Sequence, residues 1–190
     1  MELLKTLLFN PFEKYSETIL LVFGIAFTVL GTLLGFYFDA RFDGVLDMHF
    51  VRNATLKEVA LDNLIAIFCL FIFLFGAAKF INSKTRFIDI LNTILISRIA
   101  IYLLALSPKP SDELTKKLLQ NDFSQIDNFD ISLLMIGAFM ALLSLVWYIT
   151  LLFNGFKTAS NAKKSLPIIL FAVSIILAEI LSKILISYFN

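Results

Sequence analysis

The stretch TILLVFGIAFTVLGTLLGFYF, residues 18–38, contains no charged side chain. A helix of about 20 apolar residues crosses the roughly 30 Å hydrocarbon core of a bilayer, so this stretch predicts a transmembrane helix. Four more stretches meet the same criterion of length and composition: residues 60–79, 87–106, 131–153 and 166–188. The sequence therefore predicts an all-α polytopic membrane protein, in which five transmembrane helices form one bundle and a single domain over residues 1–190.

The overall composition points the same way and removes several classes of protein. The chain is 59% hydrophobic and only 16% charged, with a mean hydropathy of +0.87. Soluble domains are about half apolar and about a quarter charged, so a soluble globule and a disordered chain are both excluded. The single cysteine and the single histidine can form neither an internal disulfide nor a Cys/His zinc cluster.

Net charge and motifs argue against nucleic-acid binding and catalysis. The net charge of +1 leaves no basic footprint for nucleic acid. The sequence also contains no HExxH, GxSxG, P-loop or GxGxxG motif, which are the common signatures of metalloproteases, hydrolases and nucleotide-binding enzymes. We therefore expect no enzyme activity, no catalytic residue, no bound metal and no cofactor.

The distribution of Lys and Arg predicts the orientation in the membrane. The connections after the second and fourth stretches are short and carry Lys and Arg without neighbouring acids, whereas the other two are longer and mix both signs. Short basic connections stay in the cytoplasm, so we expect a cytoplasmic N-terminus and an external C-terminus. No small-residue cleavage site follows the first stretch, so we expect it to be retained rather than removed as a signal peptide.

Three segments between or before the spans carry further predictions. Residues 2–9 form an amphipathic pattern typical of a short helix on the membrane surface, acting as an anchor for the first span or as a docking element. Ser111 is a suitable N-cap for a short helix in the connection after the third span. The connection after the first span carries acids at four-residue steps, and we expect a solvated acidic loop there rather than a metal site: Asp39, Asp43 and Asp47, followed by His49.

Small residues recur at helical spacing in two spans. Such residues let helix backbones approach closely in a membrane, where hydrophobicity does not drive helix association. We expect them to mark packing within the bundle, with a homodimer interface as the alternative: Gly24, Gly31, Gly35, Gly137 and Ala141.

Ionisable residues inside the spans are candidates for function, because burying a charge in a membrane is costly. Four such residues form a candidate polar cluster: Asp62, Arg98, Glu179 and Lys183. Counting about 1.5 Å per residue from the helix ends places Arg98 and Glu179 at similar depth, which predicts that they face each other. Lys183 follows Glu179 at the favourable i,i+4 spacing and lies nearer the level of Asp62, which suggests two stacked pairs of opposite sign.

The third span has a second polar feature. One face carries a stripe of polar side chains: Asp89, Asn92, Thr93 and Ser97. Arg98 points to nearly the opposite side, so we expect this helix to be central in the bundle, or Arg98 to extend outward to the membrane surface. The polar residues fit two hypotheses, a path for a substrate or proton and a structural charge network that fixes helix register.

The pattern resembles the Yip family, the Ypt/Rab-interacting membrane proteins, in its shorter bacterial form. The resemblance rests on three features: the lead-in FNPFEKYSET, residues 9–18, five spans with the C-terminus outside, and the segment KTRFIDILNT, residues 84–93, after the second span. The long N-terminal region and the early Asp-Leu-Tyr-Gly-Pro type motif of eukaryotic members are missing, so Rab binding is not carried over. The resemblance implies a non-enzymatic protein of the bacterial inner membrane.

Two functions follow as hypotheses. The first is a membrane scaffold or adaptor that binds membrane lipids, other membrane proteins or a second copy of itself, and no nucleic acid. The alternative is a small transporter or channel subunit that uses the intramembrane Arg/Glu/Lys cluster. A water-accessible cavity that reaches Arg98 or Glu179 would favour the transporter, and a closed, fully paired cluster would favour the scaffold.

Overall fold

The computed structural model describes residues 2–120, 126–162 and 166–189. Five helical segments in this part of the chain are long and apolar enough to cross a membrane, which confirms the all-α class and the five spans. They are α2 (Glu17–Tyr37), α3 (Leu56–Ile81), the segment Phe87–Leu106, α7 (Asn128–Ser160) and α8 (Leu166–Phe189). The shorter elements are α1 (Glu2–Phe9), η1 (Pro11–Glu13), β1 (Ala40–Arg41), β2 (His49–Phe50) and α6 (Asp112–Leu119).

Capping residues explain where several helices begin. The Ser16 and Asp127 side chains accept hydrogen bonds from backbone N–H groups in the first turns of α2 and α7. Thr55 and Glu58 form a capping box at the start of α3, in which each side chain bonds the other's backbone. Ser111 caps α6, as its sequence position predicts. Each cap satisfies N–H groups that have no partner within the helix.

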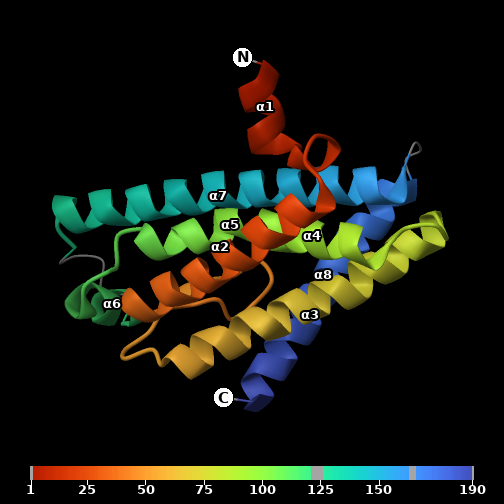
Figure 1. Ribbon diagram of the computed structural model, residues 1–190. Helices are drawn as coiled ribbons and strands as arrows, with labels where there is room; N and C mark the ends of the chain where they lie inside the picture. Colours follow the sequence, from red (N-terminus) through yellow and green to blue (C-terminus); the bar gives the residue numbers. More distant parts are fainter. Residues whose placement is uncertain (1, 121–125, 163–165, 190) are drawn as a thin grey trace.

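The bundle is organised around the third span (Figure 1). The segment Phe87–Leu106 has the largest buried share of the five spans, and its first part packs against both α2 and α7. The longest packing interface joins α3 and α8, which lie side by side. We call the end at which α2 begins and α7 finishes the N-terminal end, and the end that carries β1, β2 and α6 the hairpin end. The central position of the third span is confirmed.

The third span is not one continuous helix. It divides into α4 (Phe87–Ser97), α5 (Ile99–Tyr102) and the 3-10 turn η2 (Leu103–Leu106), with Arg98 between the first two. The Thr93 and Ser97 hydroxyls donate to carbonyls one turn earlier, at 2.8 and 2.6 Å. Such bonds compete with the helical ladder and bend helices. The interruption therefore falls at the one charged residue in the middle of this span.

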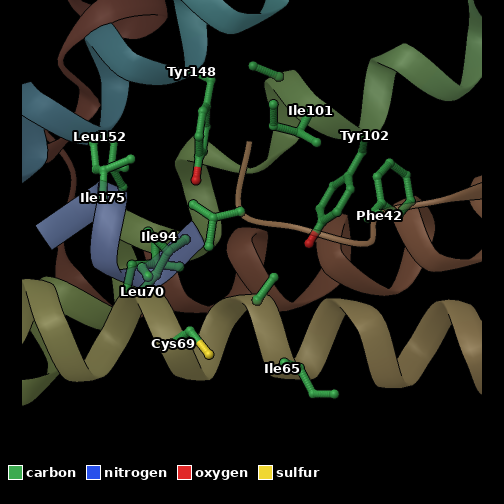
Figure 2. Close-up of a cluster of buried hydrophobic side chains, with 14 of the residues drawn as sticks. Phe42, Ile65, Cys69, Leu70, Ile94, Ile101, Tyr102, Tyr148, Leu152 and Ile175 are labelled. Carbon is green, nitrogen blue, oxygen red and sulfur yellow. The ribbon is translucent and has the colours of Figure 1, made fainter. Parts of the chain in front are cut away.

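The connection between α2 and α3 folds into the bundle. Its strands β1 and β2 pair antiparallel, with Ala40 opposite Phe50. Phe42 and Val45, which lie between the two strands in the sequence, are fully buried. The Phe42 ring packs edge-on against the Tyr102 ring, with the ring centroids 5.2 Å apart (Figure 2). A solvated acidic loop is therefore the wrong description. Non-helical backbone at this depth is tolerated because protein surrounds it.

The N-terminal helix α1 projects away from the bundle beside α7 (Figure 1). Two side chains of α7 bind its last carbonyl groups: Trp147 Nε1 donates to Leu8 O at 2.7 Å and Asn154 Nδ2 donates to Phe9 O at 2.8 Å. These bonds satisfy carbonyl groups that the end of a helix leaves without partners. A helix over residues 2–9 is confirmed, and it is attached to the bundle at its C-terminal end.

Candidate functional site

Arg98 is the centre of a buried polar network. Its side chain is completely buried, so it does not extend to the membrane surface. Its Nη2 donates to Asn63 Oδ1 at 2.9 Å, and its Nε donates to the Tyr102 hydroxyl at 3.3 Å. Asn63 in turn donates from Nδ2 to Thr32 Oγ1 at 3.0 Å. The network therefore ties the interrupted third span to both α2 and α3.

The predicted ion pair between Arg98 and Glu179 does not form. In the described part of the chain, no carboxylate lies within the 4.0 Å ion-pair distance of the Arg98 guanidinium. Arg98 Nη1 and the Tyr148 hydroxyl are both buried without a hydrogen-bond partner. Buried polar atoms without partners are rare in native proteins and call for an explanation, such as a water molecule or a functional role.

Glu179 binds the loop instead of Arg98. Its Oε2 accepts hydrogen bonds from the backbone N–H groups of Val45 and Leu46, at 2.7 and 2.9 Å. A side chain at Gly44 would place its Cβ 2.8 Å from Glu179 Oε1, so glycine lets the carboxylate approach the loop this closely. The expected i,i+4 pair is present, with Lys183 Nζ 3.4 Å from Glu179 Oε1. Glu179 thus satisfies two backbone donors of the loop.

We expect Glu179→Leu to lower the free energy of unfolding by about 2–3 kcal/mol, because it leaves two buried N–H groups without an acceptor. Glu179→Gln, which keeps one carbonyl acceptor, should cost less. The matched control is Lys183→Met, since this half-exposed lysine should contribute less than about 1 kcal/mol. Reaction of a thiol-specific fluorophore with the single cysteine, buried Cys69, reports unfolding on heating. Equal stability of wild type and Glu179→Leu would contradict the role of the carboxylate.

Asp62 forms a buried ion pair with a loop residue. Arg41 donates from Nε to Asp62 Oδ2 at 2.7 Å and from Nη2 to Oδ1 at 2.8 Å. The Asp62 side chain is fully buried and that of Arg41 is 14% exposed. The expected stacking of Asp62 with Lys183 is wrong, because Lys183 binds Asp47 at 2.8 Å on the loop. Of the four predicted cluster residues, only Glu179 and Lys183 meet.

The acidic residues of the loop are paired separately and do not form a metal site. Within the described residues, no group of three or more His, Cys, Asp or Glu side chains is arranged to hold a metal ion. Asp39 pairs with Lys109 at 3.0 Å and Asp47 pairs with Lys183. Asp43 Oδ1 lies 2.9 Å from His49 Nδ1. Asp39 and Asp47 therefore attach the loop to residues outside it, whereas the Asp43–His49 pair lies within the loop.

The His49–Asp43 pair predicts a pH dependence of stability. The Asp43 carboxylate raises the pKa of His49 above 6.5, although burial opposes the shift. A group whose pKa is raised by folding stabilises the fold fully below its unfolded pKa, and this contribution is lost as the pH rises through the folded pKa. We therefore expect the melting temperature, followed by circular dichroism, to fall as the pH rises above about 6.5, the ordinary pKa of histidine. In His49→Gln this part of the slope should vanish; an unchanged slope would show that other groups cause it.

The polar stripe of the third span lies at the N-terminal end of the bundle. Asn92, Thr93 and Ser97 are buried, whereas Asp89 is partly exposed beside a pocket of about 250 Å³. Arg86 reaches two carboxylates there, Asp89 at 2.7 Å and Glu17 at 2.8 Å. These contacts, that of Asp89 foremost, raise the pKa of Arg86. The stripe is therefore real and opens onto a polar pocket.

The small residues divide into two groups. A Cβ added to Gly24 would lie 2.7 Å from Leu95, one added to Gly31 would overlap the Tyr102 ring, and one added to Gly35 would lie 2.7 Å from Val59. These glycines mark close packing, as expected. Gly137 has no atom within 4 Å of an added Cβ, and Ala141 is exposed. The prediction that these two residues pack within the bundle is wrong.

Sequence reasoning missed the residues that complete the polar networks. The missed residues that bind or adjoin Asp62 and Arg98 are Arg41, Asn63, Tyr102 and Tyr148. At the polar pocket, the missed residues are Arg86 and Glu17, which pair with each other. One signal was present: Asn63 follows Asp62 inside an apolar span. The apolar residues Phe42 and Val45 in a charged connection also indicated that the loop is buried.

Comparison with known proteins adds no assignment. No family model, no curated protein and no solved structure matches this chain.

Proposed function

We propose that this integral membrane protein is a non-enzymatic scaffold or adaptor that binds membrane lipids and other membrane proteins. The observation that carries the proposal is the closed interior. Arg98 is completely buried, and five pockets in the described part of the chain are lined by neither Arg98 nor Glu179. Asp62 and Glu179 are both engaged in attaching the loop. A bundle whose charges hold its own segments together has the properties of a rigid binding platform. The resemblance to the Yip family also supports this proposal.

The membrane and the orientation are part of the same proposal. We place the protein in a bacterial inner membrane with its N-terminal end in the cytoplasm, because short connections rich in Lys and Arg favour that side. A cysteine at Ser83 should then react with an impermeant thiol reagent only from the cytoplasm, and a cysteine at exposed Lys116 only from outside. The reverse pattern would overturn the orientation.

The half of α7 toward the hairpin end offers a surface for a protein partner. Large apolar side chains are exposed along it, among them Met135, Phe139 and Leu142. A photo-crosslinking amino acid at Phe139 should give a discrete protein adduct in native membranes, and one at Ile184, on exposed α8, provides the comparison. An adduct of twice the chain mass would identify a homodimer. Lipid adducts alone at both positions would contradict the adaptor function.

A small transporter or channel subunit is the second candidate. It is favoured by the unpartnered Arg98 Nη1 and Tyr148 hydroxyl, since a buried guanidinium without a carboxylate attracts anions. Vesicles containing the protein should release chloride no faster than protein-free vesicles if the scaffold proposal is correct. Faster release that Arg98→Leu abolishes would establish the transporter instead.

A further inference from the structure

Two hollows adjoin at the N-terminal end of the bundle. The first is the polar pocket of about 250 Å³, whose lining includes Glu17, Arg86, Asp89 and Asn92. The second is an apolar groove of about 310 Å³, whose lining includes Ile19, Phe23, Phe27, Ile96 and Ile99. Tyr15 and Leu20 line both. A polar hollow that shares lining residues with an apolar one, at the end of transmembrane helices, has the arrangement of a site for an amphiphile.

The buried wall of the polar pocket requires a hydrogen-bond donor. Asn92 lines this pocket and is 2% exposed. Its Nδ2 donates to Glu17 O at 2.9 Å, which fixes the orientation of the amide, and its Oδ1 is buried without a partner. An unsatisfied buried acceptor is costly. The protein therefore presents an acceptor that a ligand with N–H or O–H groups would satisfy.

The charges around the pocket select a cationic donor together with an anionic group. Glu17 and Asp89 contribute two negative charges and Arg86 one positive charge, so this lining is net negative. An ammonium group carries three donors and a positive charge, and suits both the carboxylates and Asn92 Oδ1. Arg86 reaches the two carboxylates through Nε and Nη2. In the described part of the chain its Nη1 has no protein acceptor and can bind a phosphate.

We propose that this pocket binds a phosphoethanolamine group, in the form of a phosphatidylethanolamine molecule whose acyl chain occupies the apolar groove. The pocket of about 250 Å³ has room for the eight non-hydrogen atoms of phosphoethanolamine, since the same volume of liquid water would hold about eight molecules. The inference rests on the proposed function, in which lipids are ligands of the scaffold. A choline headgroup has no N–H group, and a glycerol headgroup has no positive charge, so neither matches the pocket.

The test uses the whole protein in nanodiscs that contain equal amounts of phosphatidylethanolamine, phosphatidylcholine and phosphatidylglycerol, with retained lipids measured by native mass spectrometry. We expect phosphatidylethanolamine to be enriched about tenfold over phosphatidylcholine, the ratio that one charge-assisted hydrogen bond provides. Asn92→Leu should abolish the enrichment, and Asn128→Leu, an exposed asparagine at the hairpin end, should leave it unchanged. Equal retention of the three lipids would overturn the proposal.

Further arms separate folding defects, ligand sources and the function itself. Glu17→Gln, a conservative change at a half-exposed position, should reduce the enrichment several-fold even if Asn92→Leu fails to fold. Full enrichment would contradict the role of the charges. Soluble phosphoethanolamine that raises the melting temperature in phosphatidylcholine nanodiscs, without enrichment of the lipid, would identify the free compound as the ligand and overturn the lipid form. Enrichment of phosphatidylethanolamine together with chloride release through the protein would refute the scaffold proposal and leave this inference standing. Protein adducts at Phe139 without enrichment of the lipid would refute this inference and leave the scaffold proposal standing.

Discussion

Replacing Asp62 by Ala should lower the free energy of unfolding by about 3–5 kcal/mol, the usual cost of leaving one member of a buried ion pair without its partner. Arg41 donates two hydrogen bonds to the Asp62 carboxylate and is itself only 14% exposed. The guanidinium would then remain charged and largely buried without its carboxylate partner. Thermal unfolding followed through the reaction of Cys69 with a fluorogenic thiol reagent measures the change.

A double substitution separates the pair from its surroundings. Arg41→Met combined with Asp62→Leu removes both charges, so it should be more stable than Asp62→Ala alone by about 1–3 kcal/mol. If the double variant is as unstable as the sum of its single changes, the two side chains are not coupled. That result would also remove the reason we give for the docking of the loop.

Replacing Gly31 by Leu should destabilise the protein by about 3 kcal/mol or more, because even a Cβ at this position overlaps the Tyr102 ring and overpacked sites cannot relax cheaply. Tyr102 cannot move aside freely, since it packs against Phe42 and accepts a hydrogen bond from Arg98. The substitution therefore disturbs the loop and the buried network together. Resistance to unfolding in detergent is the measurement.

Gly76→Leu is the matched control for Gly31→Leu. Both glycines lie within long transmembrane helices, but an added Cβ at Gly76 meets no atom within 4 Å. We expect Gly76→Leu to change stability by less than about 0.5 kcal/mol, as surface substitutions usually do. A similar loss in both variants would show that glycine itself, rather than the contact with Tyr102, sets the stability.

The spans could be predicted from the sequence because length and hydropathy alone determine which segments cross a bilayer. Polar residues on both sides of the third span left two alternatives, a central helix or an Arg98 that extends outward, and the burial of this span and of Arg98 supports the first. The interruption at Arg98 was not predictable in this way: Ser97 and Thr93 bond back to the helix, but the same residues occur in many straight helices. The folding of the loop into the bundle depends on contacts between segments far apart in the chain.

The polar partners illustrate the limit of counting depth along helices. Counting residues from the helix ends placed Arg98 and Glu179 at the same depth in the bundle. In the structure, however, the two side chains point to different partners. Glu179 meets backbone N–H groups of Val45 and Leu46, and no side-chain pattern in the sequence identifies a backbone donor as a partner. Gly44 permits this contact, but a lone glycine in a connection is too common in sequences to indicate one.

The closed interior can be measured directly through thiol accessibility. Ala66, one turn beyond Asn63 on α3, and Cys69 are fully buried. Cells that express the native protein, and a second variant with Ala66→Cys and Cys69→Ser, are treated with a small cationic methanethiosulfonate; a cysteine at exposed Lys116 in the Cys69→Ser background is the positive control. A scaffold with a closed interior predicts no modification of either buried thiol before unfolding in detergent. Modification of either thiol in intact membranes at the rate of the control would contradict it and indicate an aqueous path to Arg98.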